Sequence, residues 1–197
     1  MKITREKLDK LYAHGDWLYW FEEKFPNGSE LNNIIKQSLE EEYFDFANWI
    51  ILKLGLSRIN KIRYVSHIAE LVLPIFEDEY PEDKRPRDTV EKIKIYLNTG
   101  QMPLYDSVES LNLYIIYSHC RRFCDNAGMS AAGAIYSAYV AITLSEHIYC
   151  GSAITGSPYV YASRALRYSK YILQNKEFKT KIINYGMELI ENNGEKS

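Results

Sequence analysis

The sequence predicts an all-α fold, a compact bundle of about seven to eight helices. Its apolar residues recur mostly at steps of three and four, the spacing that places them on one face of a helix. Turn residues stand far enough apart to leave room for helices of about 12 to 24 residues. The 197 residues are 46% hydrophobic, so one core can form without disulfides or metal. A single domain over residues 1–197 is therefore expected.

Breaker residues delimit the first expected elements. A first helical segment spans about Thr4–Phe25 and ends at Pro26-Asn27-Gly28. Ser29 is expected to cap a short second helix. The apolar residues of that helix are Leu31, Ile34, Ile35 and Leu39. A very apolar run, Tyr43–Leu56, then follows the acidic Glu40–Glu42 and ends near Gly55.

A long helix is expected next, with Ser57 as its cap. Its apolar stripe consists of Ile59, Ile62, Val65, Ala69, Val72 and Phe76. Pro74 interrupts this stripe, and because proline removes a backbone donor, a kink or a fresh start is expected near Leu73. Glu77–Arg85 is interpreted as a charged connection. Pro86 then opens a helix that runs to about Leu97 and ends at Asn98-Thr99-Gly100.

The second half changes character, from charged helices to helices rich in small residues. A helix is expected from Asp106 toward Cys124, followed by the charge-free run Asn126–Ser145. Small residues recur in that run at helical spacing, at Ala131, Ala134, Ala138, Ala141 and Ser145. A further helix opens at Ser157-Pro158, and a last one spans Glu177–Ile190, with a fraying tail, Glu191–Ser197. The change near Gly100 suggests subdomains over residues 1–100 and 101–197.

Charge and composition exclude several function classes. The chain has 24 Lys+Arg against 26 Asp+Glu, and no basic block exceeds two residues, so the signature of a nucleic-acid binder is absent. The polar and glycine content of the charge-free run argues against a membrane helix. Three cysteines form no disulfide framework, and no signal-peptide pattern precedes them. A cytoplasmic location is therefore expected.

Two groups of residues could carry chemistry, but neither has a specific pattern. Soft metal ligands gather at His119, Cys120, Cys124, His147 and Cys150. No CxxC or HExxH spacing is present, so core packing is favoured over zinc binding. Glu146-His147 could supply an acid and a base, yet no nucleophile or phosphate loop accompanies it. We therefore expect no enzyme, no catalytic residue, no metal and no cofactor, and keep a helical metal-dependent hydrolase as the alternative from the enzyme class.

The densest run of acidic residues is the candidate partner-binding surface. Its carboxylates are Glu77, Asp78, Glu79, Glu82 and Asp83, and Lys84, Arg85 and Arg87 follow directly. Such a run is typical of a solvated connection, but it also suits a docking surface that steers a basic partner. The guanidinium groups of Arg85 and Arg87 can reach carboxylates upstream, while Pro86 fixes a helix start.

Five stretches of the sequence carry a resemblance to known proteins: Trp20-Phe21 with Phe25-Pro26-x-Gly28, Asp45-Phe46-Ala47-Asn48-Trp49, Arg63-Tyr64 leading to Ala69-Glu70-Leu71-Val72, Phe76-Glu77 with Tyr80 through Arg87, and Tyr161-Ala162-Ser163-Arg164-Ala165. Together they resemble one family, the Imm5-like immunity proteins of bacterial genomes and mobile elements. The stretch that ends at Arg87 is the most specific. The residues that we assign to this shared motif in structural roles are Trp20, Phe21, Asp45, Asn48, Trp49, Pro86, Tyr161 and Arg164.

The resemblance implies a protein that binds a cognate toxin and blocks it, without direct contact to nucleic acid or membrane. Relatives also occur in phages, so an inhibitor of a host defence nuclease is a variant of the same mechanism. The departures from the family pattern are His14-Gly15-Asp16 and the bulky Tyr114, Tyr117 and Tyr136. A homodimer or oligomeric scaffold, packed through the small-residue faces, is a third hypothesis. Trp49 is expected to anchor the core with Phe46, so that Trp49→Ala costs about 3–5 kcal/mol if Trp49 is buried.

Overall fold

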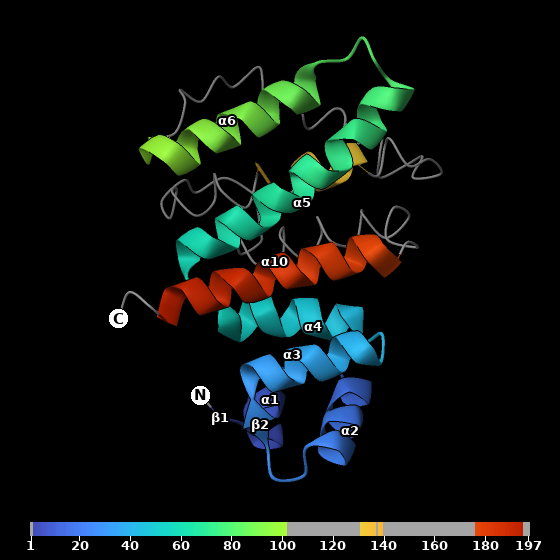
Figure 1. Ribbon diagram of the computed structural model, residues 1–197, viewed down its shortest axis with the longest axis vertical. Coiled ribbons are helices and arrows are strands. Elements are labelled where there is room, and N and C mark those ends of the chain that lie inside the picture. Colours follow the sequence, from blue (N-terminus) through green and yellow to red (C-terminus); the bar gives the residue numbers. More distant parts are fainter. Residues whose placement is uncertain (1, 102–130, 137, 140–175, 195–197) are drawn as a thin grey trace. The chain divides into compact units, whose positions relative to one another are not determined.

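The computed structural model describes residues 2–101, 131–136, 138–139 and 176–194. Helices account for 80% of the described residues, which confirms the all-α class (Figure 1). The helices are α1 (Arg5–Lys10), α2 (Gly15–Lys24), α3 (Leu31–Glu40), α4 (Phe44–Ile50) with a π-helical turn (Ile51–Gly55), α5 (Arg58–Glu79), α6 (Arg85–Thr99) and α10 (Lys176–Gly194). Two short strands, β1 (Lys2–Ile3) and β2 (Ser29–Glu30), are also described, and residues 131–136 and 138–139 are helical.

The chain divides into two compact units. The first consists of Met1–Gly55 together with Ile183–Ser197, and the second spans Leu56–Ile182. Helix α10 therefore begins in the second unit and ends in the first. The division falls at Gly55, whereas the change in composition lies near Gly100.

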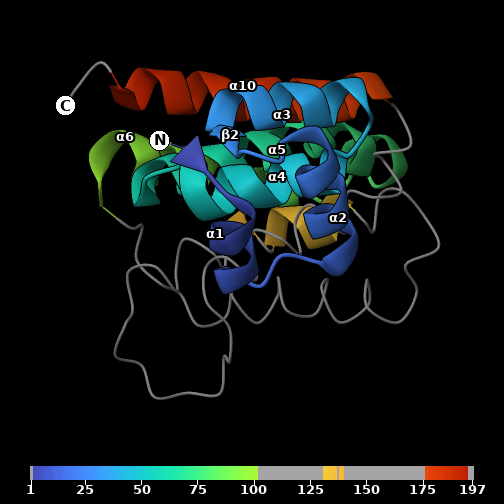
Figure 2. The same cartoon turned by 90° about the horizontal axis from the view of Figure 1, so that it is seen from below.

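The first unit begins with a two-stranded antiparallel ladder that the sequence did not indicate. Ile3 of β1 pairs with Ser29 of β2, and Lys2 pairs with Glu30, next to the start of α3 (Figure 2). The expectation that Ser29 caps α3 is therefore wrong. Glu30 precedes α3 instead and makes no side-chain cap. The reason is long-range pairing: strand formation uses the residue whose local preference is for a cap.

A tight turn at Tyr12 divides the expected first helix, Thr4–Phe25, into α1 and α2. Tyr12 has a φ of 60°, the left-handed conformation. Its N–H donates to the Asp9 carbonyl and the Ala13 N–H to the Leu8 carbonyl, the two bonds of a Schellman motif. His14 then caps α2, with Nδ1 accepting the Asp16 N–H. Because glycine usually occupies this left-handed position, a tyrosine there does not signal the end of α1.

The predicted second helix is confirmed as α3, and it also ends in a Schellman motif. Glu42 has a φ of 64°, its N–H donates to Leu39 O, and the Tyr43 N–H donates to Ser38 O. The apolar run that follows forms α4 and continues as the π-helical turn, which ends at Gly55. Single π-helical turns of this kind are rare, and most of them occur within α-helices.

Close packing of aliphatic side chains joins the end of α10 to the π turn of the first unit. A Cβ atom at Gly55 would lie 2.5 Å from Ile190 Cδ1, so a larger residue there would require the Ile190 side chain to shift. Ile183 and Leu189 of α10 are also buried. The last helix is thus confirmed but is longer than predicted, because residues Glu191–Gly194, expected to fray, continue it.

Helix α5 of the second unit follows the predicted cap and most of the predicted stripe. Ser57 Oγ accepts the Asn60 N–H at 3.4 Å. All stripe residues are buried except Ile59, which is 40% exposed. Helix α5 continues through Pro74, so of the two alternatives expected near Leu73 the fresh start is wrong, and a kink stays a prediction. Pro74 lies on the exposed side of the helix, where the carbonyl that loses its partner can be hydrated.

Helix α6 confirms the predicted start and end. Pro86 lies in its first turn, where no backbone donor is needed, and Gly100 ends it with a φ of 69°. The expected segments between Gln101 and Lys176 fall largely outside the described residues. Of the small-residue stripe, Ala131, Ala134 and Ala138 are described and all three are buried in helix.

Candidate protein-binding surface

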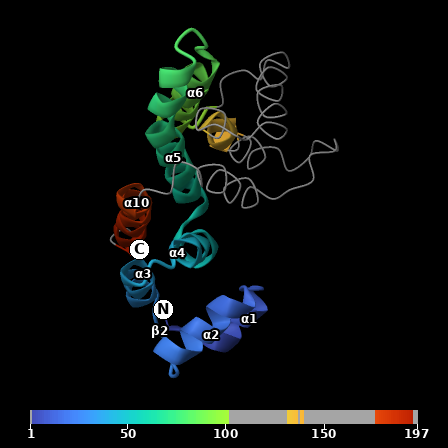
Figure 3. The ribbon, with the colours of Figure 1, turned by 90° about the vertical axis from the view of Figure 1, so that its right-hand side faces the viewer.

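The acidic run lies at the tip of the α5–α6 hairpin, two antiparallel helices that run side by side (Figures 1 and 3). Only Tyr80–Lys84 form the connection, because Glu77–Glu79 belong to the last turn of α5. The expectation of a charged connection over Glu77–Arg85 is corrected accordingly. The loop is tight: the Asp83 N–H donates to Tyr80 O at 3.1 Å, and Tyr80 packs on Phe76 with ring centroids 5.0 Å apart.

Two arginine–carboxylate pairs hold this tip together. Arg87 donates from Nε and a terminal nitrogen to both carboxylate oxygens of Glu77, which joins α6 to α5. Arg85 donates in the same two-pronged way to Asp83, and the Arg85 N–H adds a third bond at 3.1 Å. Bidentate geometry is the strongest form of such a pair. The expected reach of both guanidinium groups to upstream carboxylates is therefore observed.

The arginines shift the titration of both carboxylates. The hydrogen bonds from Arg87 hold the pKa of Glu77 below the ordinary value for a glutamate, and Arg85 does the same for the pKa of Asp83. The partners respond in the opposite sense, so the pKa values of Arg85 and Arg87 are raised. Four of the seven candidate partner-binding residues are thus charged but already paired with each other.

Three carboxylates of the tip remain directed to solvent, and we call Asp78, Glu79 and Glu82 the hairpin carboxylates. All three residues are exposed, and among the described residues none of them has an ion-pair partner. Asp78 and Glu79 stand in the last turn of α5, which contains no basic residue. A carboxylate there faces the negative end of the helix dipole, which disfavours it. Helix stability therefore does not explain these two residues.

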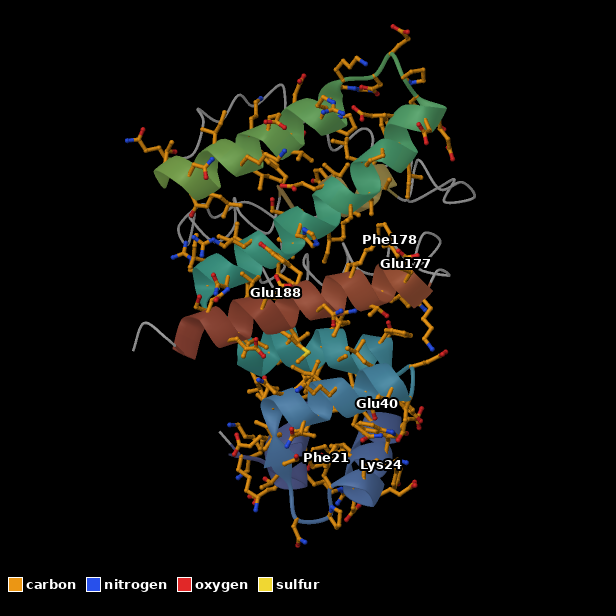
Figure 4. All side chains as sticks on the ribbon, in the orientation of Figure 1. Phe21, Lys24, Glu40, Glu177, Phe178 and Glu188 are labelled. Carbon is orange, nitrogen blue, oxygen red and sulfur yellow. The ribbon has the colours of Figure 1, made fainter. Side chains whose placement is uncertain are left out.

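The structural motif residues divide between core and surface. Phe21, labelled in Figure 4, is fully buried, and Trp20, Asn48 and Pro86 are buried too. Asp45 is exposed, and Trp49 is only half-buried, so Phe46 rather than Trp49 is the buried anchor of α4. The ring centroid of Phe46 lies 5.5 Å from those of both Trp17 and Trp20. Tyr161 and Arg164 lie outside the described residues.

Sequence reasoning missed a polar hub in the first unit, the Glu41 carboxylate at the end of α3. It accepts hydrogen bonds from Trp20 Nε1 at 2.8 Å and Gln37 Nε2 at 2.9 Å, and Lys24 Nζ lies 2.9 Å away. These donors, led by Trp20, lower the pKa of Glu41. Only the Gln37–Glu41 spacing of four was visible in the sequence. The hub fixes the orientation of α2 against the α3–α4 turn.

The residues of the hydrolase hypothesis, including Glu146, His147 and the three cysteines, lie outside the described residues. Within the described ranges, no three His, Cys, Asp or Glu side chains gather closely enough to hold a metal ion. In the same ranges, no helix combines the length and apolar character that crossing a membrane requires.

Comparison with known proteins gives one partial match. Residues 1–54 match the family described as the YdhT N-terminal domain. The matched stretch ends within one residue of Gly55, where the first unit's N-terminal part also ends. No curated protein and no solved structure shows significant similarity to the chain.

Proposed function

We propose that this protein is a non-enzymatic inhibitor that binds a protein target and occludes it, as an immunity-type antidote does with its toxin. The observation that carries the proposal is the set of hairpin carboxylates, Asp78, Glu79 and Glu82, presented without ion-pair partners among the described residues. The resemblance to Imm5-like immunity proteins supports the same function, since such an antidote needs a surface and no catalytic centre.

The construction of the hairpin supports a binding role. The Glu77–Arg87 and Asp83–Arg85 pairs fix the tip before any partner arrives, and a preorganised surface loses less conformational entropy on binding. Two of the three carboxylates lie at the unfavourable end of the α5 dipole. A binding function can account for carboxylates at a position that opposes helix stability.

The partner implied by this surface carries positive charge. Toxins that act on nucleic acid present basic residues to phosphate groups, and carboxylates in those positions both block the site and accelerate association. In this proposal the protein acts in the cytoplasm and contacts neither nucleic acid nor membrane. A phage-encoded inhibitor of a host defence nuclease works by the same surface, and the captured target distinguishes the two.

The first experiment is affinity capture from native host cells or phage-infected cells, with mass spectrometry of the retained proteins. Recovery of one stoichiometric toxin or defence protein supports the proposal. Light scattering of the free protein tests the homodimer or scaffold hypothesis in the same preparation. Elemental analysis distinguishes the hydrolase hypothesis from the antidote, because a metal-dependent hydrolase requires stoichiometric zinc or iron.

The second experiment maps the surface with matched variants. Charge reversal of the hairpin carboxylates to lysine leaves both arginine pairs intact, and the control reverses Asp9, Glu40 and Glu188, three exposed residues of the first unit that lie away from the hairpin in the sequence. Both triple variants change net charge equally. We expect the hairpin variant to associate at least about tenfold more slowly with the captured target, and the control to change little. Equal slowing by both variants would remove the hairpin from the binding surface.

A further inference from the structure

The turn before β2 contains Asn27-Gly28, a dipeptide in which the backbone nitrogen of the glycine can react with the side chain of the asparagine. The glycine nitrogen can attack the side-chain amide of the asparagine, because no Cβ atom on the glycine hinders the approach. Asn27 is exposed, as is Pro26 before it. The turn therefore offers a modification site whose reactivity the surrounding structure must control.

The folded turn engages the Gly28 nitrogen, the group that would have to attack. The Gly28 N–H donates to the Phe25 carbonyl at 2.8 Å and closes the turn. Gly28 has a φ of 75°, and a Cβ there would lie 2.5 Å from the Ile3 carbonyl oxygen, so β1 lies directly against this glycine. Ile3 in turn is fully buried and pairs with Ser29. The β1–β2 ladder thus restrains Gly28 in addition to its hydrogen bond.

We propose that Asn27 is a latent deamidation site that the pairing of β1 with β2 protects. In the reaction, the Gly28 nitrogen forms a bond to Asn27 Cγ, the Cγ–Nδ2 bond breaks, and ammonia leaves with the proton of the Gly28 amide. Water then opens the cyclic imide at either carbonyl, which leaves aspartate or isoaspartate at position 27. No oxidant or cofactor takes part.

Protection follows from the hydrogen bond and the ladder together. Attack requires that the Gly28 N–H leave the Phe25 carbonyl and that the Gly28 nitrogen turn toward the side chain of Asn27. Departure of a two-residue strand is a local opening, which requires less free energy than unfolding the helices. When opening and closing are fast, the reaction rate follows the population of the open form.

The products would not fit the folded turn. Both add one negative charge, and isoaspartate also lengthens the backbone by one carbon between Phe25 and Gly28. The register of Ile3 with Ser29 depends on that spacing. Conversion at Asn27 would therefore release β1 and loosen the start of α3, within the stretch that matches the YdhT N-terminal domain.

The test follows conversion by peptide mass mapping of the full-length protein in mildly alkaline buffer. Wild type is compared natively, in concentrated urea, and as Ile3→Ala, which weakens the anchor of β1; circular dichroism checks that the helices of this variant persist. Asn27→Gln is the chemical control, and Asn98, followed by Thr99, is the reference within the chain. We expect conversion at Asn27 to be at least about tenfold faster in urea than in the native protein, and about three- to fivefold faster in Ile3→Ala.

The urea comparison does not depend on whether Ile3→Ala folds. Equal rates at Asn27 in native and urea-unfolded wild type overturn the proposal, since the fold then provides no protection. A conversion that accelerates in urea but not in a helical Ile3→Ala also contradicts it, because β1 would not be the protecting element.

Discussion

The N-terminal part of the first unit, residues 2–55, and the α5–α6 hairpin differ in the residues that they place at helix boundaries. In the former, Tyr12 and Glu42 take the left-handed conformation that favours glycine, and both helix ends still close as Schellman motifs. In the hairpin, Ser57 caps one helix and Gly100 ends the other, each residue where its intrinsic preference places it.

The difference shows that strained helix ends can be tolerated where packing supplies the compensating stability. In residues 2–55 a cluster of rings surrounds the buried Phe46: Trp17 and Trp20 contact Phe46, and Tyr43 stacks on Trp20. The hairpin has buried side chains of its own along α5 and α6, and its tip adds the two arginine pairs. Variants at Phe46 therefore test packing in the first region, and changes of pH and salt test the charge pairs of the hairpin.

The largest expected effect is that of Phe46→Ala. Phe46 is fully buried among aromatic rings, so its truncation leaves a cavity and should lower the free energy of unfolding by about 3–5 kcal/mol. Trp49→Ala, at a half-buried position on the same helix, should lower it clearly less, although the sequence alone made Trp49 and Phe46 joint anchors. Urea unfolding of both variants measures the difference. Equal losses of unfolding free energy would mean that Trp49 is as well packed as Phe46.

Gly100→Ala should have the next largest effect. Gly100 has a φ of 69°, and no heavy atom lies within 4 Å of the position that a Cβ would occupy, so the change introduces backbone strain without a clash. We expect a destabilisation of about 1 kcal/mol, because an L-residue in the left-handed conformation costs about 1–2 kcal/mol. Thermal unfolding checks it. A neutral result would show that the end of α6 can adjust its conformation, and that the hairpin depends less on its capping glycine than its geometry suggests.

The sequence predicted the hairpin well because its signals are local. Ser57, Pro86 and Gly100 each act on the backbone within one helical turn, and each helix begins or ends where those residues indicate. The arginine pairs also join residues close in sequence, at separations of 2 and 10. The fold class and the helices of this region could be anticipated from such signals and from apolar spacing.

Long-range contacts and unusual conformations explain what the sequence did not predict. Ser29 pairs with Ile3 across the whole of α1 and α2, so its local preference for a cap did not decide its structure. Tyr12 is no indication of a left-handed turn. Glu41 binds Trp20 from 21 residues away. At the candidate site, the seven charged residues were predicted, but only the fold separates the paired residues from the hairpin carboxylates.

Tyr12→Gly should stabilise the protein, the opposite sign from Gly100→Ala. Tyr12 is 93% exposed, so its side chain contributes little packing, while its φ of 60° carries the strain of a left-handed residue. Relief of that strain should outweigh the added entropy of glycine in the unfolded chain and raise the unfolding free energy by about 0.5–1 kcal/mol. Thermal unfolding, with Tyr19→Gly in the interior of α2 as a destabilising control, measures it. A loss of stability in Tyr12→Gly would show that the ring makes contacts that outweigh the strain.

The smallest effect should come from the hairpin's arginine pairs and should depend on pH. Because Arg87 and Arg85 lower the pKa values of Glu77 and Asp83 in the folded protein, the unfolded chain binds more protons in acid. The stabilisation is therefore complete above the ordinary pKa values of 4.5 and 3.8, and it is lost as the pH falls through the lowered values. A Glu77→Gln, Asp83→Asn double variant should be less stable than wild type at neutral pH, by less than Gly100→Ala, and the difference should vanish in acid.

Salt provides an independent check on the same double variant. Half-exposed arginines leave both pairs open to screening, so added salt should shrink the difference from wild type at neutral pH. Urea unfolding across a pH and salt series measures both dependences. A difference that persists unchanged through acid and salt would assign the loss to packing of the α5–α6 tip. The tip would then depend on packing, as the region around Phe46 does.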